Sequence, residues 1–129
     1  MNLPTKAVKA VITNEQGQIL LLQRNPATRS VDNWDLPGGL VEDREDEQTA
    51  LIREVQEELR VQIVIVESAS TWQFLRSKDN QIVKVQNYNC RIKSGEITLS
   101  DEHIAYQWVD PKVLRKYPVK DESLYGAIR

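Results

Sequence analysis

The stretch GLVEDREDEQTALIREVQEELRV, residues 39–61, directly follows the tripeptide Leu-Pro-Gly at positions 36–38. Three of its glutamates, Glu54, Glu57 and Glu58, fall on one turn if the segment is helical. Carboxylates a few ångströms apart repel one another and raise each other's pKa, so such a cluster costs free energy. The position of this cluster beside a glycine turn predicts that a divalent cation binds there.

Residues 46–59 are predicted to form a helix with an apolar stripe beside an acidic edge. A helix advances 100° per residue, so the three glutamates share an arc of about 100°, adjoined by Leu51, Ile52, Val55 and Leu59. Glu54 and Glu58 are spaced i, i+4 and can converge on one ion. Hard carboxylate oxygens suit Mg²⁺ or Mn²⁺. The alternative is a solvated acidic face, but the glycine turn and the full spacing favour a metal site.

The spacing of these residues matches the Nudix signature, in which a glycine, five residues, a glutamate and seven residues precede Arg-Glu-apolar-x-Glu-Glu-x-Gly-apolar. The matching residues are Gly39, Glu45, Arg53, Glu54, Val55, Glu57, Glu58 and Val61. The chain therefore resembles the Nudix hydrolases, which use a divalent metal to split a pyrophosphate bond in nucleoside diphosphates linked to another group. The resemblance implies an α/β fold, an α/β/α sandwich with a mixed β-sheet and a loop–helix–loop catalytic motif.

The resemblance also implies the metal ligands. In this family, residues at the positions of Glu54, Glu57 and Glu58 carry the metal, and the carbonyl of Gly38 adds a ligand. Gly38 and Gly39 have a physical reason to be glycines, because a backbone without a Cβ can turn sharply and come close to an ion. The expected cofactor is Mg²⁺, with Mn²⁺ as a substitute.

Arg53 is expected to orient carboxylates rather than contact substrate, because Arg53 and Glu57 are spaced i, i+4 and can pair. The resemblance implies that Glu45 supports the loop–helix–loop through Arg53. The family reaction is attack of water on phosphorus, so a base must accept a proton. Glu57 and Glu102 are the candidate bases; Glu102 is also expected to contact the metal, with an ordinary acidic loop as the alternative. Carboxylates explain the chemistry without His103, which is expected to be structural or exposed.

Four residues outside the signature are candidates for substrate binding. Arg24 and Arg29 flank the passage from a predicted strand into the loop before the glycine turn, and a guanidinium fork matches phosphate oxygens. Trp34 could stack on a base, although aromatic residues of this size are more often part of the core. Asp121 stands where some family members read a base edge, and capping of a last helix is its alternative role.

Arg60 replaces the second glycine of the signature, at the end of the predicted helix. A glycine there commonly adopts the left-handed conformation, which costs an arginine about 1 kcal/mol or more. Two alternatives are ordinary dihedrals with another exit path and a guanidinium that reaches the substrate. Substrate contact is the least favoured, because residue 60 falls outside the acidic arc. The departure concerns stability more than chemistry, so the enzyme prediction stands.

The remaining elements follow from apolar runs separated by polar turns. Residues 61–77 and 81–92 are predicted to form a long β-hairpin that turns at residues 78–80. The further predicted elements are strands at 6–13, 18–24 and 104–109, a short helix starting at 110–111 and a last helix at 121–128.

The bulk properties predict one domain over residues 1–129, with the signature at 39–61. A hydrophobic content of 40% and a charged content of 28% are ordinary for a soluble globular protein. The chain has no long apolar run and no secretory signal pattern, and its one cysteine, Cys90, excludes an intrachain disulfide, so a cytoplasmic location is expected. No run of Lys and Arg suggests a groove for a nucleic acid polymer.

The sequence predicts a metal-dependent hydrolase that converts a nucleoside triphosphate into a nucleoside monophosphate and pyrophosphate. The alternatives are a pyrophosphatase of ADP-ribose, a sugar nucleotide or a dinucleoside polyphosphate, and a non-catalytic module that binds a nucleotide. The expected partner is a small nucleotide, and the expected assembly is a monomer or a homodimer. A calcium-binding structural domain is disfavoured, because the chain lacks the Asp- and Asn-rich loop spacing of such a site.

Overall fold

The computed structural model describes residues 5–25 and 34–117. The elements in chain order are β1 (Thr5–Ile12), β2 (Ile19–Arg24), β3 (Trp34–Asp35), β4 (Gly38–Leu40), α1 (Glu47–Leu59), β5 (Gln62–Arg76), β6 (Gln81–Ser94), β7 (His103–Val109) and the 3-10 helix η1 (Pro111–Lys116). The predicted hairpin, the long helix and the three other predicted strands are all present, shifted by one or two residues at their ends. The short helix after Asp110 is present as a 3-10 turn.

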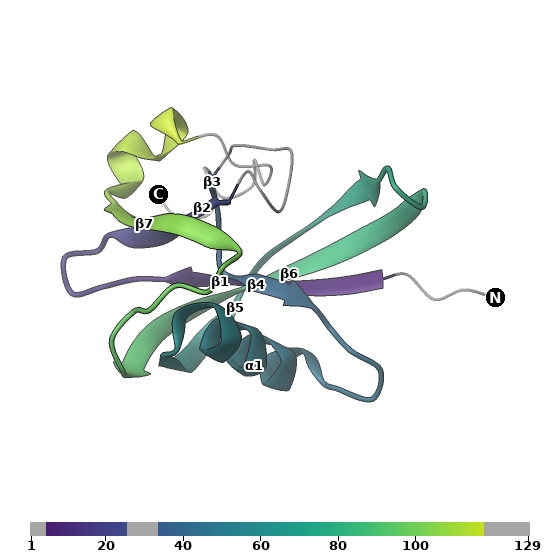
Figure 1. Ribbon diagram of the computed structural model, residues 1–129, viewed down its shortest axis with the longest axis horizontal. Coiled ribbons are helices and arrows are strands. Elements are labelled where there is room, and N and C mark those ends of the chain that lie inside the picture. Colours follow the sequence, from purple (N-terminus) through teal and green to yellow (C-terminus); the bar gives the residue numbers. More distant parts are fainter. Residues whose placement is uncertain (1–4, 26–33, 118–129) are drawn as a thin grey trace.

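The strands form two sheets, and α1 lies against the four-stranded one (Figure 1). The four-stranded sheet has the order β4-β1-β6-β5, and the three-stranded sheet has the order β3-β2-β7. β1 pairs in parallel with β6, whereas every other strand pair is antiparallel. The fold is thus an α/β fold with a mixed sheet, as predicted.

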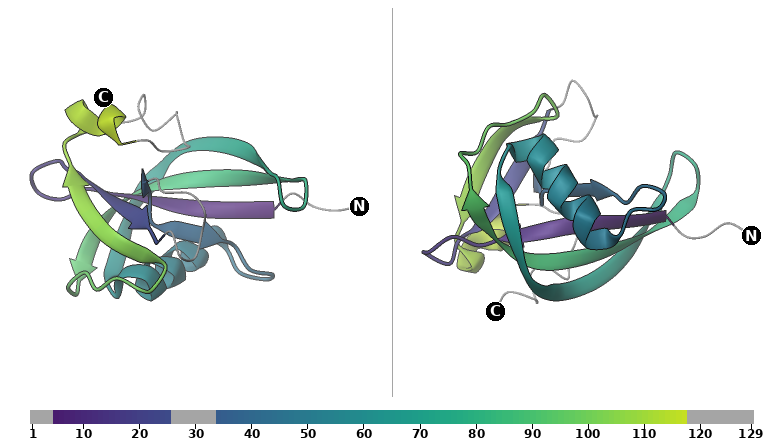
Figure 2. Two further views of the ribbon diagram at one scale, coloured as in Figure 1. Left: turned by 45° about the horizontal axis from the view of Figure 1, so that its top comes forward. Right: turned by 90° about the horizontal axis from the view of Figure 1, so that it is seen from below.

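The main core lies between α1 and the four-stranded sheet, and Figure 2 shows α1 crossing that sheet face when the molecule is seen from below. Strand side chains alternate between faces, and alternate residues of β1 meet the apolar stripe of the helix: Val8, Ala10, Ile12, Leu51, Val55 and Leu59. Ile52 was predicted to belong to the stripe but is 45% exposed. It lies at the far edge of the stripe, beyond the reach of the sheet.

Both ends of α1 have identifiable caps. Asp46, predicted as the first helical residue, is instead the N-cap, and its carboxylate accepts a hydrogen bond from the Thr49 amide at 2.8 Å. At the other end Arg60 has φ 57° and ψ 33°, and its amide donates to the Gln56 carbonyl. Arg60 therefore occupies the left-handed position that the signature gives to glycine.

Cys90 is buried in β6, and burial raises the pKa of its thiol to about 12. No helix within residues 5–25 and 34–117 has the length and apolar character needed to cross a membrane. The predicted helix at 121–128 lies outside the described residues, as do the candidate residues Arg29 and Asp121.

Candidate active site

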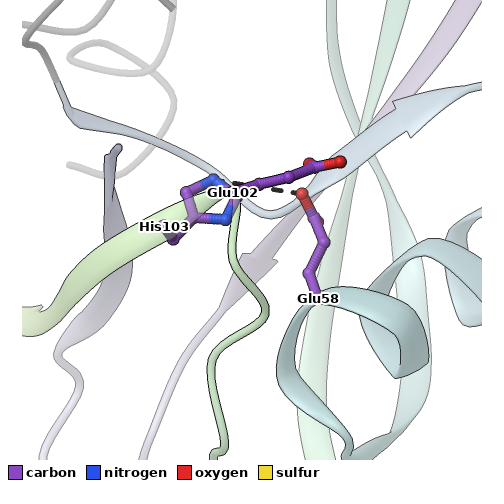
Figure 3. A group of neighbouring side chains, drawn as sticks. All are labelled: Glu58, Glu102 and His103. Carbon is purple, nitrogen blue, oxygen red and sulfur yellow. Dashed lines mark ion pairs between the residues drawn. The ribbon is translucent and has the colours of Figure 1, made fainter. Parts of the chain in front are cut away.

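The acidic edge of α1 faces the loop that leads into β7. Together they line a cleft of about 290 Å³ formed by Glu54, Glu57, Glu58, Ser100, Asp101 and Glu102. Figure 3 shows Glu58 pointing from α1 toward Glu102 and His103 at the start of β7. The structure therefore brings the signature carboxylates together with Glu102, a residue about forty positions further along the chain.

Glu58 is the most buried of these carboxylates, with an exposed fraction of 6%. Its Oε1 accepts a hydrogen bond from the Gly38 amide at 2.8 Å. Burial raises the pKa of Glu58 to about 8, and the nearby Glu54 and Glu102 add to the rise, whereas Lys9 and the Gly38 amide oppose it. In the absence of a cation, this carboxyl group therefore holds its proton near neutral pH.

Glu54 and Glu57 differ in exposure although they lie on the same edge. The Glu54 side chain is 19% exposed, and burial is the main cause that raises its pKa. A Cβ on Gly39 would stand 2.5 Å from the Glu54 carboxyl carbon, so any other residue there would displace the end of that side chain from its present position. Glu57 is 59% exposed and borders the cleft from the solvent side.

Arg53 links the helix to the loop before it. Its Nε and Nη2 lie 2.7 and 2.9 Å from the two carboxylate oxygens of Glu45, which is the bidentate geometry of a strong pair. Its Nη1 reaches Glu54 at 3.0 Å and Glu57 at 3.4 Å, and Nη2 also donates to the Leu40 carbonyl. The Arg53 hydrogen bonds lower the pKa of Glu45 to about 2. The side chain thus holds carboxylates on both sides of the loop–helix junction.

The residues of the cleft fit a divalent cation. Glu58, Glu102 and His103 each offer a ligand atom, and these three atoms lie within 4.8 Å of one another. The donors are mainly carboxylate oxygens, which Mg²⁺ and Mn²⁺ prefer. The raised pKa values of Glu58 and Glu54 also fit a cation site. Buried carboxylates that lie close together become stable as anions once a cation neutralises them.

His103 is buried, with an exposed fraction of 8%. Its Nε2 lies 4.0 Å from Glu58 Oε2, and its Nδ1 has no hydrogen-bond partner among the described residues. Burial and the charge of Arg24 lower the pKa of His103, which keeps the ring neutral. Of the two roles expected for His103, exposure is thereby ruled out. Its proximity to Glu58 was not predicted, because it depends on how β7 pairs with β2.

A cluster of three charged residues, Lys9, Arg24 and Asp35, lies next to the glycine turn. Asp35 Oδ2 is 3.0 Å from Lys9 Nζ and 2.7 Å from Arg24 Nη2. Arg24, predicted to contact substrate phosphate, is thus held by Asp35. The sequence reasoning missed Lys9 and Asp35. The sequence does contain a sign of the role of Lys9, because Lys9 lies on the same strand face as the buried residues Ala7 and Val11. A lysine on such an apolar face needs a charged or polar partner.

Trp34 lies in β3 and makes an edge-to-face contact with Tyr117, with ring centroids 5.3 Å apart. It packs against the second core cluster, which includes Leu21 and Leu36. This packing agrees with the structural alternative for Trp34, and a stacking role toward a base stays a prediction. The predicted roles of Arg29 and Asp121 also stay predictions, because both residues lie outside the described part of the chain.

Comparisons with known proteins point to one family. A family model described as the NUDIX domain matches residues 3–126. A CTP pyrophosphohydrolase of Escherichia coli (strain K12) is 30% identical over 112 residues, which cover 87% of this chain and 81% of that protein. The crystal structure of a MutT protein from Methanosarcina mazei Go1 is 30% identical with a TM-score of 0.82, and the match covers 98% of this chain and 94% of that one. The solution structure of the E. coli ORF135 protein is 28% identical with a TM-score of 0.75, covering 93% and 83%.

The family match spans nearly the whole chain, and three glutamates of the signature, Glu54, Glu57 and Glu58, line one cleft. The structural match to the MutT protein of Methanosarcina mazei covers 98% of this chain and so includes both its mixed sheet and α1. The chain therefore belongs to the NUDIX family and is a Nudix-type pyrophosphohydrolase, an enzyme that acts on phosphorus-containing anhydrides.

Proposed function

We propose that this enzyme hydrolyses nucleoside triphosphates to a nucleoside monophosphate and pyrophosphate, with Mg²⁺ as its cofactor and Mn²⁺ as a substitute. The observation that carries the proposal is the cleft in which the glutamates of α1 face Glu102 across the loop before β7. The relative named a CTP pyrophosphohydrolase, which matches most of this chain, supports a triphosphate substrate.

The carboxylates of the cleft would hold the metal: Glu54, Glu57, Glu58 and Glu102, with the Gly38 carbonyl as a further ligand. When bound, a divalent cation neutralises charge on phosphate oxygens and lowers the pKa of a coordinated water. The acidic edge alone would repel a polyphosphate, so charge neutralisation is needed before such a substrate can approach.

The side chains of the cleft supply proton transfer and orientation. Glu57 and Glu102 are exposed, unlike Glu54 and Glu58, and either can accept the proton of the attacking water. Arg53 fixes the direction of the Glu54 carboxylate through its 3.0 Å contact, and thereby keeps the donor set converged. Arg24, held by Asp35, is the candidate that binds a substrate phosphate.

A panel of nucleotides tests the proposal. The purified protein is incubated with Mg²⁺ and with each common nucleoside triphosphate, 8-oxo-dGTP, ADP-ribose, a sugar nucleotide and a dinucleoside polyphosphate, and the products are separated by chromatography. Triphosphates should give the monophosphate and pyrophosphate, and Glu54→Gln should lose this turnover while Glu15→Gln, in the exposed turn after β1, should keep it. Faster turnover of ADP-ribose would replace the proposed substrate, and binding without turnover of any compound would favour a non-catalytic module.

A further inference from the structure

Lys9 is a lysine that the fold buries next to the glycine turn. Its side chain is only 14% exposed. In the pairing of β1 with β4, Lys9 is the cross-strand partner of Gly38. Its Nζ donates to Asp35 Oδ2 at 3.0 Å and to the Leu36 carbonyl at 3.3 Å. One ammonium group therefore holds two consecutive residues of the segment that ends at Gly38.

The stem of Lys9 also lies against Gly38 itself. A Cβ built on Gly38 would clash with the Val8 carbonyl oxygen and stand 3.0 Å from Lys9 Cδ, and Gly38 has φ 147°. The backbone at Gly38 lies close against β1, in a conformation that residues other than glycine rarely adopt. The position of the Gly38 peptide consequently depends on where Lys9 and its strand hold the turn.

Asp35 joins this arrangement to Arg24. Its Oδ1 accepts the Leu36 amide at 2.8 Å, while its Oδ2 is shared by the two cations, Lys9 and Arg24. Burial opposes ionisation of Asp35, but the two cations outweigh it and hold the pKa of this carboxyl below its ordinary value. The side-chain contacts of Asp35 thus join Lys9, Arg24 and the Leu36 amide, and none of those in the described residues extends to the acidic edge of α1.

The glycine turn is joined to that edge by a hydrogen bond at Gly38. The Gly38 amide donates to Glu58 Oε1 at 2.8 Å, and Glu58 is buried among the carboxylates of the cleft. We propose that Lys9 is a positioning residue: by holding Asp35 and the Leu36 carbonyl it fixes the Gly38 peptide, and through that peptide it orients Glu58 for binding a divalent cation. The inference rests on the proposed metal-dependent function, and it assigns Lys9 no contact with the substrate.

The sign of the effect separates this role from simple electrostatics. Lys9 carries a positive charge close enough to Glu58 to lower its pKa. If charge alone mattered, removing it would strengthen the binding of another cation at the same carboxylates. If Lys9 positions the turn, removing it should weaken cation binding, because partners that orient metal ligands typically contribute about 10–100-fold to affinity.

The test measures Mn²⁺ affinity without nucleotide, by electron paramagnetic resonance of the free ion. Lys9→Met keeps the length of the stem and removes the donors, and it should raise the Mn²⁺ dissociation constant by about tenfold or more. Lys6→Met is the matched control, since Lys6 is an exposed residue of the same strand, and it should change the constant by less than about twofold. Lys9→Arg, which retains donors for Asp35, should recover most of the loss.

A second readout follows the turn directly. The exchange of the Gly38 amide should quicken about tenfold or more in metal-free Lys9→Met, whereas the Thr98 amide, bonded to the Leu59 carbonyl at 2.9 Å, should keep its rate. If Lys9→Met does not fold, Asp35→Asn should reproduce both effects more weakly.

Unchanged or tighter Mn²⁺ binding in folded Lys9→Met would overturn the inference, as would unchanged exchange at Gly38. Neither readout uses a nucleotide, so a wrong substrate proposal would leave this test intact. Conversely, an enzyme that hydrolyses triphosphates normally after Lys9→Met would refute the positioning role and keep the proposed function.

Discussion

The carboxyl group of Glu58 is subject to two opposing requirements. It lies in the interior, where a charge is poorly solvated, and it belongs to the acidic edge that a cation is proposed to occupy. A protein keeps such a residue at a cost in stability when the group serves a function. We therefore expect Glu58 to lower the stability of the metal-free protein and to increase the turnover of the enzyme.

We predict that Glu58→Gln and Glu54→Gln each lower kcat by about a hundredfold or more, the size of effect seen when an electrostatic stabiliser is lost. In excess chelator the same variants should melt at the same temperature as the wild type or higher, because Glu54→Gln removes a carboxylate from a crowded set and Glu58→Gln removes a buried carboxyl group that is costly to ionise. Steady-state kinetics and thermal melts check both halves. Turnover close to wild type in both variants would contradict the proposed role of the acidic edge.

Glu58 also predicts how the stability of the metal-free protein depends on pH. Its pKa is raised from 4.5 to about 8, so between these values the folded protein holds a proton that the unfolded chain has lost. Stability supplied by that proton is fully present below about pH 4.5 and disappears as the pH rises through about 8. Melts in chelator should show this decline, and Glu58→Gln should flatten it. A wild type and a variant with the same pH profile would show that Glu58 ionises normally.

Among single residues, those of the signature could be predicted and their partners could not. Glu54, Glu57 and Glu58 lie on one edge because helical periodicity is a local property of the sequence. Lys9 meets Asp35 only because β1 and β4 pair, and His103 approaches Glu58 only because β7 begins beside α1. Contacts of this kind depend on strand order and register, which a single sequence does not encode locally.

At the scale of elements, the end of α1 is where this chain departs from its family signature. Arg60 has φ 57°, a conformation that costs a residue with a Cβ about 1 kcal/mol or somewhat more. Its amide still caps the helix by donating to the Gln56 carbonyl. The helix therefore ends as it would with glycine, and the strain is carried by the arginine.

We predict that Arg60→Gly leaves stability unchanged or raises it by up to about 1 kcal/mol, because the relief of strain is offset in part by the greater freedom of glycine in the unfolded chain. The kcat should not change. Arg60→Ala is the control, since it removes the same side chain and keeps the Cβ, and it should bring no gain. Denaturant unfolding measures the difference between the two variants. A rise in KM without a change in melting temperature would mean that the guanidinium contacts substrate instead.

Most elements were predicted well, and the two shortest strands, β3 and β4, were missed. The helix and the β5–β6 hairpin extend over many residues, so their periodicity is clear and their ends fall within one or two residues of the prediction. β3 and β4 have two and three residues, too few for an alternating pattern. They exist because β1 and β2 offer edges to pair with, and together they place the Leu36–Gly38 turn against the cleft.

For the whole molecule, the fold and the proposed metal site are separable. The main core joins α1 to the sheet through apolar side chains, whereas the carboxylates line the neighbouring edge of the helix. We predict that excess chelator abolishes activity while circular dichroism stays essentially unchanged. Added Mg²⁺ or Mn²⁺ should raise the melting temperature by mass action, since the ion binds only the folded site. Full turnover in excess chelator, or loss of the helical signal, would contradict this separation.

During synthesis, β1 leaves the ribosome long before its parallel partner β6 has been translated. Until then β1 can pair only with β4, over three residue pairs, and its other edge, which pairs with β6 over eight residue pairs in the folded protein, stays open. At about 5–20 residues per second, this interval lasts several seconds. We therefore expect the nascent chain to be a substrate for chaperones that hold extended apolar segments, and we expect translation arrested before β6 to leave a fragment that cannot close its central sheet.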